Sequence, residues 1–341
     1  MKPTVHDIAA HAGVSLATVD RVLNRRPGVR SLTREKVERA VAALGYVRDT
    51  AAANLAKGQL YPLVFVLPTG ENPFFQELRR EVSEAALRGV HDRLTIRVVN
   101  VAAFDGVALA HALDELDPAD VCGVALVAVD IPAVAAAVER LKQAGVSVVT
   151  LVSDLAHSVR DHYAGIDNMA AGRTAASLIG RFAAGVSGPV QVIIGSHSVR
   201  DHRDRLDGFR AVLTAEYPQL MLLPVIEGMD DADRVATALE EAFTRVPDIR
   251  AIYSLGAGNA GLVRVLARHQ KAGHVFTIAH ELSPATRTAL ETGLIDTVLH
   301  QDAGHEVRSA IRVLRAKADG QPIVAAQERI RLDIFLRDNL P

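Results

Sequence analysis

The spacing of apolar residues changes near residue 60. Over the first 46 residues, apolar side chains recur every three or four positions, as they do in amphipathic helices. From residue 62 onward, short apolar runs such as LVFVLP and LTIRVVNV alternate with helical stretches. Apolar strands separated by helices predict parallel sheets covered on both faces. Ten such runs are too many for one compact sheet, so we expect two sheets with a cleft between them.

Three helices are predicted in the first 46 residues. Their caps are predicted at Thr4, Ser15 and Thr33, and left-handed turns at Gly13 and Gly45. A helix, a short glycine turn and a second helix around a small aliphatic core form the helix-turn-helix pattern.

The second of these helices leaves one face turned away from the core. That face carries Leu16, Ala17, Asp20 and Arg21. Arg21 is the natural guanine reader, because its planar guanidinium matches the O6 and N7 acceptors. Ser15, Thr18 and Asn24 are placed to hold phosphates. The alternative is a small helical bundle with a solvated arginine.

Charge is distributed unevenly along the chain. Residues 1–60 carry ten Lys and Arg against five Asp and Glu, whereas the whole chain has a net charge of −2. A basic head on an acidic body fits nucleic-acid binding by the head. The single cysteine, Cys122, permits no internal disulfide, and no HExxH pair is present, so neither a metal nor another cofactor is expected. With no secretory signal or membrane-length apolar run, we expect a cytoplasmic location without membrane contact.

The stretches AGVSLATVDRVLN and TREKVERAVAALGY resemble the DNA-binding head of the LacI/GalR family of bacterial repressors. The resemblance implies that Leu16, Ala17 and Arg21 read bases. It further implies that Ser15, Thr18, Asn24 and Tyr46 contact the DNA backbone. Two positions depart from the family pattern, because Asp20 replaces the usual serine and Arg48 a common proline. The family's usual operator sequence is therefore not assumed.

Residues 51–56 are rich in alanine and helix-prone, yet too short to be helical alone in water. Such a segment suits a switch, since modest forces fold or melt it. By resemblance, two of these helices pair in the minor groove of the operator, where Ala52 and Leu55 contact DNA and Leu55 wedges between base pairs. The alternative is a plain linker.

The loops that follow the strands are expected to carry ligand-binding groups. In the first loop, Asn72 caps a helix, and the rings of Phe74 and Phe75 could stack on the C–H face of a sugar. The alternative for these phenylalanines is a hydrophobic staple at the helix start. Asp130 ends the third strand and could accept hydroxyl hydrogens.

The remainder of the chain resembles the type I periplasmic sugar-binding fold, of the ribose-binding kind. The motif NPFF matches its ligand loop, and Arg203 in RDRLDGF matches its ligand-binding arginine. Glu281 stands where the family has an aspartate, and Gln301 matches a polar residue of the cleft. Gly256 stands near a usual asparagine, so Asn259 is expected to replace it.

The predicted fold class is an all-α helix-turn-helix head joined to an α/β periplasmic-binding-protein-like sensor of two parallel-sheet lobes. The expected parts are a head at 1–46, a hinge at 47–61 and a sensor at 62–341. Lobe 1 is expected at about 62–162 and 284–322, and lobe 2 at about 163–283 and 323–341.

The function these features predict is a homodimeric repressor, not an enzyme, which binds double-stranded operator DNA and a small sugar-like effector. Two alternatives belong to other classes. A transport solute-binding protein accounts for residues 62–341 but not for the head. A nucleotide-dependent oxidoreductase would use the GxGxxG at Gly256–Gly261, which lies too deep in the sensor to open a nucleotide-binding domain.

Overall fold

The computed structural model describes residues 3–24, 26–46, 60–89, 93–183, 185 and 187–341. The chain divides into two compact units between Gln59 and Leu60. Arg48, Ala52 and Leu55 of the predicted hinge lie outside the described residues. None of the helices in the described ranges is both long and apolar enough to cross a membrane.

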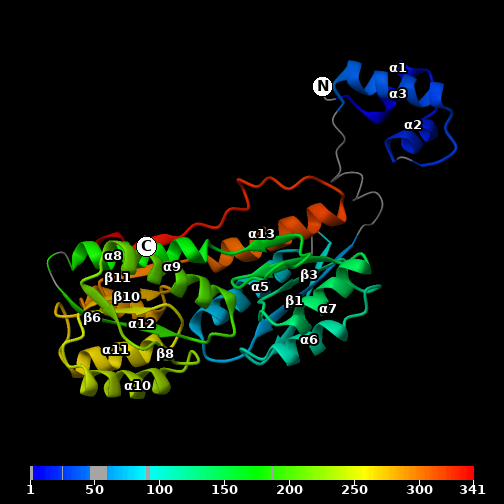
Figure 1. Ribbon diagram of the computed structural model, residues 1–341. Helices are drawn as coiled ribbons and strands as arrows, with labels where there is room; N and C mark the ends of the chain where they lie inside the picture. Colours follow the sequence, from blue (N-terminus) through cyan, green and yellow to red (C-terminus); the bar gives the residue numbers. More distant parts are fainter. Residues whose placement is uncertain (1–2, 25, 47–59, 90–92, 184, 186) are drawn as a thin grey trace. The chain divides into compact units, whose positions relative to one another are not determined.

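The first unit contains three helices: α1 (Val5–Ala12), α2 (Leu16–Leu23) and α3 (Ser31–Leu44) (Figure 1). They enclose an aliphatic core in which Ile8, Val19 and Val37 are fully buried. The predicted helical head is therefore present.

Local capping explains where the helices of the head begin and end. Thr4 forms a capping box with Asp7, and the Ser15 hydroxyl accepts from the Thr18 amide at 3.2 Å. Gly13 and Gly45 follow helices with φ of 64° and 59°, which favour glycine. The predicted cap at Thr33 is wrong. The third helix begins at Ser31, after Arg30, without a side-chain cap.

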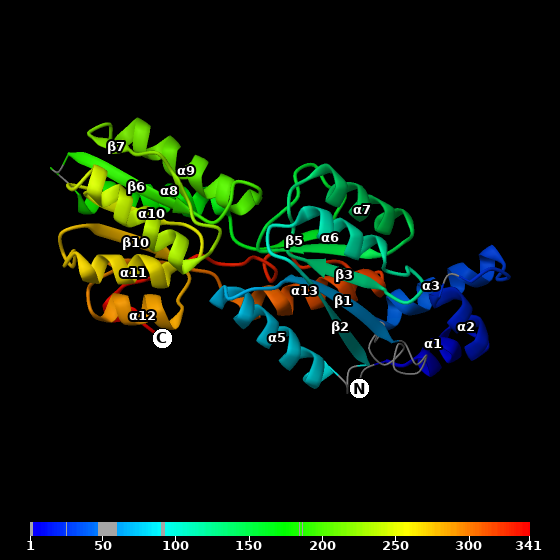
Figure 2. The same cartoon turned by 90° about the horizontal axis from the view of Figure 1, so that it is seen from below.

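The first sheet of the large unit has five parallel strands in the order β2-β1-β3-β4-β5 (Figures 1 and 2). Its strands are β1 (Tyr61–Pro68), β2 (Leu94–Val101), β3 (Gly123–Leu126), β4 (Ser147–Leu151) and β5 (His162–Ala164). Its helices are α5 (Pro73–Gly89), α6 (Gly106–Asp114), α7 (Pro132–Gln143) and α13 (Ala303–Ala318). This sheet and its helices form the first lobe.

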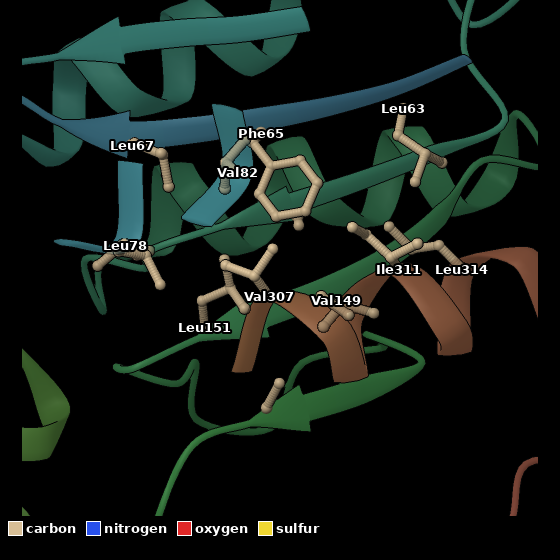
Figure 3. Packing of buried hydrophobic residues seen from close by; sticks show 14 of the residues in the cluster. Leu63, Phe65, Leu67, Leu78, Val82, Val149, Leu151, Val307, Ile311 and Leu314 are labelled. Atoms are coloured by element: carbon tan, nitrogen blue, oxygen red, sulfur yellow. The ribbon is translucent and has the colours of Figure 1, made fainter. Parts of the chain in front are cut away.

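Alternate residues of β1 face opposite cores. Phe65 packs with α5 and α13, whereas Val64 and Val66 pack with α6 and α7. Figure 3 shows Phe65 among Val82, Val307 and other apolar side chains of the first core. Each fully buried side chain of this size contributes about 1.5–3 kcal/mol relative to exposure. This two-sided burial explains why the strands have continuous apolar sequences.

The second sheet runs in the order β12-β11-β10-β9-β6-β7, with β8 beside β6. Its strands are β6 (Gly188–Ile194), β7 (Leu220–Leu222), β8 (Ile226–Glu227), β9 (Ala251–Ser254), β10 (Phe276–His280), β11 (Thr297–His300) and β12 (Asp333–Phe335). Its helices are α8 (Asn168–Phe182) and α9 (Arg200–Glu216) on one face, and α10 (Ala232–Arg245), α11 (Asn259–Arg268) and α12 (Pro284–Glu291) on the other. A 3₁₀ turn follows at Arg337–Asn339.

The predicted pair of parallel-sheet lobes is confirmed, with two differences in detail. The apolar run LMLLPVI forms two short strands, β7 and β8, on either side of Pro224. The short edge strand β12 was not predicted, and it pairs antiparallel with β11.

The chain crosses between the lobes three times. It leaves the first lobe after β5, returns between β11 and α13, and leaves again after α13 to form β12. The predicted return at residue 284 requires correction, because β11 pairs with β10 and keeps residues 284–300 in the second lobe. The crossovers also contact one another, since Ile166 and Ile330 share a small apolar cluster.

Candidate functional site

A cavity of about 410 Å³ lies between the two lobes, at the carboxyl ends of the strands. Its size falls within the range of roughly 300–1,000 Å³ that is usual for small-molecule sites. The predicted residues that line it are Asn72, Phe74, Phe75, Asn259, Glu281 and Gln301.

The wall from the first lobe is mainly apolar and aromatic. Phe74 and Phe75 meet edge to face, with ring centroids 6.1 Å apart, and Phe104 lies on the same wall. Phe74 is 6% exposed and belongs to the first core, and it also lines the cavity. Asn72 caps α5 by accepting from the Phe74 amide at 3.0 Å.

Asn72 also connects the lobes. Its Nδ2 donates to Asp230 Oδ2 at 2.8 Å, and Asp230 Oδ1 accepts from the Ala257 amide at 2.8 Å. Asp230 has a left-handed φ of 56°, as does Met229 before it at 52°. This strained turn aims the carboxylate at both partners. Asp230 is not among the predicted site residues, because its only signal in the sequence is an acidic pair a few residues after a short strand.

The wall from the second lobe is polar and charged, and α9 supplies much of it. Asp201, His202 and Arg205 are all buried and line the cavity. Arg205 donates from Nε to Asn168 Oδ1 at 2.7 Å and from Nη1 to the Leu255 carbonyl at 2.8 Å. Its Nη2 has no partner among the described residues.

Arg203 and Asp130, both predicted as ligand contacts, do not line the cavity. They form an ion pair with each other across the two lobes, and Arg203 also donates to the His197 carbonyl at 2.9 Å. Of the two arginines in this motif, Arg205 lines the cavity and the predicted Arg203 does not. Helical periodicity could have shown this, because Arg205 shares the buried face of α9 with Phe209, whereas Arg203 lies on the other face.

Glu281 is held by a polar network at the base of the cavity. Its Oε1 accepts from Gln301 Nε2 at 2.9 Å, and its Oε2 lies 3.0 Å from His300 Nδ1. Burial disfavours the charge on His300, but the hydrogen bond and charge of Glu281 outweigh it and raise the pKa of His300. Glu281 thus favours the protonated form of His300.

The loop Gly256–Gly261 follows β9 and opens α11. Its glycines serve close packing, because a Cβ at Gly261 would lie 1.9 Å from the Ala232 carbonyl oxygen. Asn259 is buried, and its amide spans the Ser254 hydroxyl and the His280 carbonyl. These contacts account for the GxGxxG motif without a dinucleotide.

His280 stands beside Asn259 at the end of β10. Burial and the charge of Arg205 hold the pKa of His280 well below its usual value, so the ring is neutral. Its Nε2 shares a hydrogen bond of 2.9 Å with the Tyr253 hydroxyl, and its Nδ1 has no partner among the described residues.

In the head, the predicted DNA-facing residues Ser15, Leu16, Ala17 and Arg21 are exposed, while Thr18 and Asn24 are half-buried. Asp20 Oδ1 accepts from Asn24 Nδ2 at 2.6 Å, and the Asp20 carboxylate pairs with Arg26 at 3.3 Å. Tyr46 packs against the core of the head. No three His, Cys, Asp or Glu side chains come together as a metal site in the described ranges.

The sequence model of the periplasmic binding protein domain matches residues 63–322, and that of bacterial regulatory proteins of the lacI family matches residues 4–49. The chain belongs, over most of its length, to the periplasmic binding protein domain family, and its head matches the domain of the lacI family of bacterial regulatory proteins.

Among curated relatives, catabolite control protein A of Priestia megaterium is 37% identical over 86 residues, which are 25% of this chain and 26% of that protein. The ribose operon repressor of Halalkalibacterium halodurans is 39% identical over 83 residues, which are 24% of this chain and 25% of that protein. The chain thus matches about a quarter of the length of these regulators.

Solved structures show the same fold for the large unit. GanP, a glucose-galactose binding protein from Geobacillus stearothermophilus, superposes with a TM-score of 0.74 at 19% identity, over 83% of this chain and 99% of that one. A solute-binding protein from Burkholderia graminis in complex with D-arabinose has a TM-score of 0.74 at 23% identity, over 82% of this chain and 96% of that one.

Proposed function

We propose that the protein is a transcription repressor that binds operator DNA through its head and a small, sugar-like effector in the cavity between the lobes. The observation that carries this proposal is the presence of a lacI-type head and a two-lobed cleft in one chain. A transport binding protein has no use for the head.

The head is proposed to act as a homodimer in the cytoplasm, with two copies on two half-sites of a near-palindromic operator. The proposed DNA contacts are Ser15, Leu16, Ala17, Thr18, Arg21, Asn24 and Tyr46, together with Ala52 and Leu55 of the hinge. The effector changes operator affinity because it binds two conformations of the lobes with different affinities. No cofactor and no catalytic step is part of this proposal.

Operator binding tests the proposal directly. Purified full-length protein is titrated on fragments from upstream of its own gene, at two salt concentrations and against unrelated DNA. We expect tight, salt-sensitive and sequence-selective binding. Absence of selective binding to any such fragment contradicts the repressor assignment.

Arg21→Ala is expected to lower the preference for operator over unrelated DNA by about 10- to 100-fold, because a bidentate base contact is lost. Arg39→Ala is the matched control, because Arg39 is exposed on α3 and its substitution also removes one positive charge. Thermal denaturation shows that both heads remain folded. Equal losses of selectivity in the two variants would exclude Arg21 as a base reader.

A further inference from the structure

The charges around the cavity limit what kind of effector can enter it. Five carboxyl residues line the cavity, against a single arginine, Arg205. The carboxyl residues are Glu71, Asp201, Asp230, Asp231 and Glu281. The other arginines at the start of α9, Arg200 and Arg203, do not line it. An anionic ligand would therefore enter a site of mainly negative charge.

The atoms without partners show what the cavity has left to offer a ligand. Four residues of the lining each carry a buried polar atom with no partner among the described residues: Asp201 Oδ1, Arg205 Nη2, His280 Nδ1 and Gln301 Oε1. They comprise a guanidinium donor, a carboxylate acceptor, an amide acceptor and an imidazole nitrogen. Buried polar groups are satisfied in nearly all proteins, so these four point to a ligand that satisfies them.

A hydroxyl group both donates and accepts, and it matches this mixed set. Asp201 and Arg205 lie four residues apart on α9, so they face the same side of that helix. Adjacent hydroxyls on one molecule could donate to Asp201 Oδ1 and accept from Arg205 Nη2. The apolar wall with Phe75 and Phe104 opposite suits the C–H face of such a molecule.

We propose that the effector is an uncharged polyhydroxy compound, and that Asp201 is the residue that excludes sugar acids and sugar phosphates. This proposal rests on the proposed function and narrows its ligand. A buried carboxylate is stabilised by hydrogen-bond donors and repelled by a second negative charge, so an anionic group beside Asp201 is disfavoured.

The test uses full-length protein and matched sugars in a calorimetric titration. Aldohexoses, aldopentoses and their alditols are screened first, and the uronic acid, the 6-phosphate and the 2-amino derivative of each binder follow. We expect at least one neutral compound to bind, with its acid and phosphate weaker by about 100-fold or more. Binding of an anion within about 10-fold of its neutral parent, tighter binding of the amine, or no neutral binder at all overturns the proposal.

Asp201→Asn makes the test residue-specific. The substitution keeps the shape of the side chain and removes its charge, so the gap between the neutral sugar and its acid is expected to narrow by about 10-fold or more. Asp204→Asn is the control on the same helix, because Asp204 pairs with Arg200 and does not line the cavity. If Asp201→Asn leaves the difference in affinity between the neutral sugar and its acid unchanged, Asp201 is not the residue that excludes anions.

Measuring operator binding in the same preparations distinguishes a failure of the proposed ligand class from a failure of the proposed repressor function. If an anion releases the protein from its operator, regulation stands and only the ligand class fails. If neutral sugars bind but no DNA fragment does, the ligand class stands and the proposed function fails.

A second inference rests on a hydrogen-bond chain at the first crossover. Arg205 Nε donates to Asn168 Oδ1 at 2.7 Å, and Asn168 Nδ2 donates to the Tyr163 hydroxyl at 2.9 Å. The Tyr163 hydroxyl donates in turn to the Val152 carbonyl at 2.7 Å. Tyr163 belongs to β5 of the first lobe, and Asn168 begins α8 of the second. The chain therefore connects the cavity to both sides of the crossover.

Three glycines allow this arrangement. A Cβ at Gly165 would lie 2.3 Å from the Tyr163 hydroxyl, and one at Gly172 would lie 1.9 Å from the Arg205 carbonyl oxygen. On the facing helix, a Cβ at Gly208 would lie 2.2 Å from the Met169 carbonyl oxygen. Helices α8 and α9 thus pack backbone to backbone, and Arg205 cannot shift far without moving Asn168.

We propose that Asn168 and Tyr163 are positioning residues that connect the effector's contact with Arg205 to the angle between the lobes. Their role goes beyond effector binding itself, although it rests on the proposed function. The hydroxyl of Tyr163 is the group at which the chain enters the first lobe.

Tyr163→Phe tests this role, because it removes only the hydroxyl. Effector affinity is expected to change by less than about 3-fold, whereas the ratio of operator affinities with and without effector falls by about 10-fold. Tyr217→Phe is the control, since Tyr217 packs over Gly180 at the far end of α8. A wild-type ratio in Tyr163→Phe overturns the proposal.

A structural role for Tyr163 predicts a different result. In that case effector affinity, operator response and melting temperature would fall together, and the positioning role would be rejected. Asn168→Asp supplies the second variant, since Oδ1 remains an acceptor for Arg205 while the donor to Tyr163 is lost. It is expected to reproduce the loss of operator response.

Discussion

The two walls of the cavity differ in chemistry. The first lobe supplies rings and aliphatic side chains, such as Phe75, Phe104 and Val127, whereas the second supplies Asp201, His202 and Arg205. An apolar wall contributes affinity without fixing orientation, while a few placed polar groups decide which molecule fits. Specificity is therefore expected to come mainly from the second lobe, and closure against the first lobe to exclude water.

Among the substitutions in the two walls, that of Arg205 is expected to have the largest effect on stability and on effector affinity. Arg205→Met leaves Asn168 Oδ1 and the Leu255 carbonyl without their donor in a buried site, so it should lower the free energy of unfolding by about 1–3 kcal/mol for each of these acceptors. Effector affinity should fall by at least about 100-fold. Denaturant unfolding and calorimetric titration measure the two effects.

Arg203→Met is the matched control for this prediction. Its side chain is 36% exposed and does not line the cavity, so its effects should stay within about 1 kcal/mol. Equal losses in the two variants would mean that the polar wall does not depend on Arg205.

Substitutions of the two phenylalanines in the apolar wall should affect stability and effector binding differently. Phe74→Ala creates a cavity in the first core and should lower the free energy of unfolding by about 3 kcal/mol. Phe75→Ala, at a half-buried position, should cost less stability and weaken effector binding by about 10-fold. Identical profiles of stability and affinity would contradict this division.

His300 gives the polar wall a pH dependence. Its pKa in the folded state is raised above 6.5 by Glu281, and Glu77 and Asp333 act in the same direction. Its stabilising contribution is therefore complete below about pH 6.5 and is lost as pH rises through the folded-state pKa. Denaturant unfolding from about pH 6 to 8 should show this loss in wild type and not in His300→Gln. Parallel curves for the two proteins would exclude it.

The smallest effect is expected outside the cavity, at the ion pair between Asp130 and Arg203. A double-mutant cycle on unfolding should give a coupling energy of about 0.2–1 kcal/mol that decreases with added salt, because both side chains are partly exposed. A larger, salt-independent coupling would place this pair among the main contacts between the lobes.

The sequence predicted the fold better than the site. The spacing of apolar residues and the helix caps, such as Ser15, depend on neighbouring residues of the chain. They were sufficient to predict the head and the parallel-sheet lobes. Contacts between distant segments left little local signal. Asp130 follows a strand as a ligand carboxylate would, yet it pairs with an arginine 73 residues later. Asp230 depends on a turn whose left-handed φ values could not be predicted from its residue types alone.

Arg205 is a different case, because its burial can be predicted from its position along α9. The motif RDRLDGF contains two arginines, and the resemblance was assigned to the first. The buried stripe of Leu206, Phe209 and Leu213 favours the second.

The return of the chain through α13 has a consequence for synthesis on the ribosome. Val307, Ile311 and Leu314 cover a sheet whose strands end at residue 164 (Figure 3). The ribosome delivers those strands well over a hundred residues before the helix that seals them. Until then, Phe65 and its neighbours lack part of their cover. The first lobe is therefore begun early in synthesis and completed late. During this interval its partly uncovered apolar core is most prone to aggregation and most in need of chaperones.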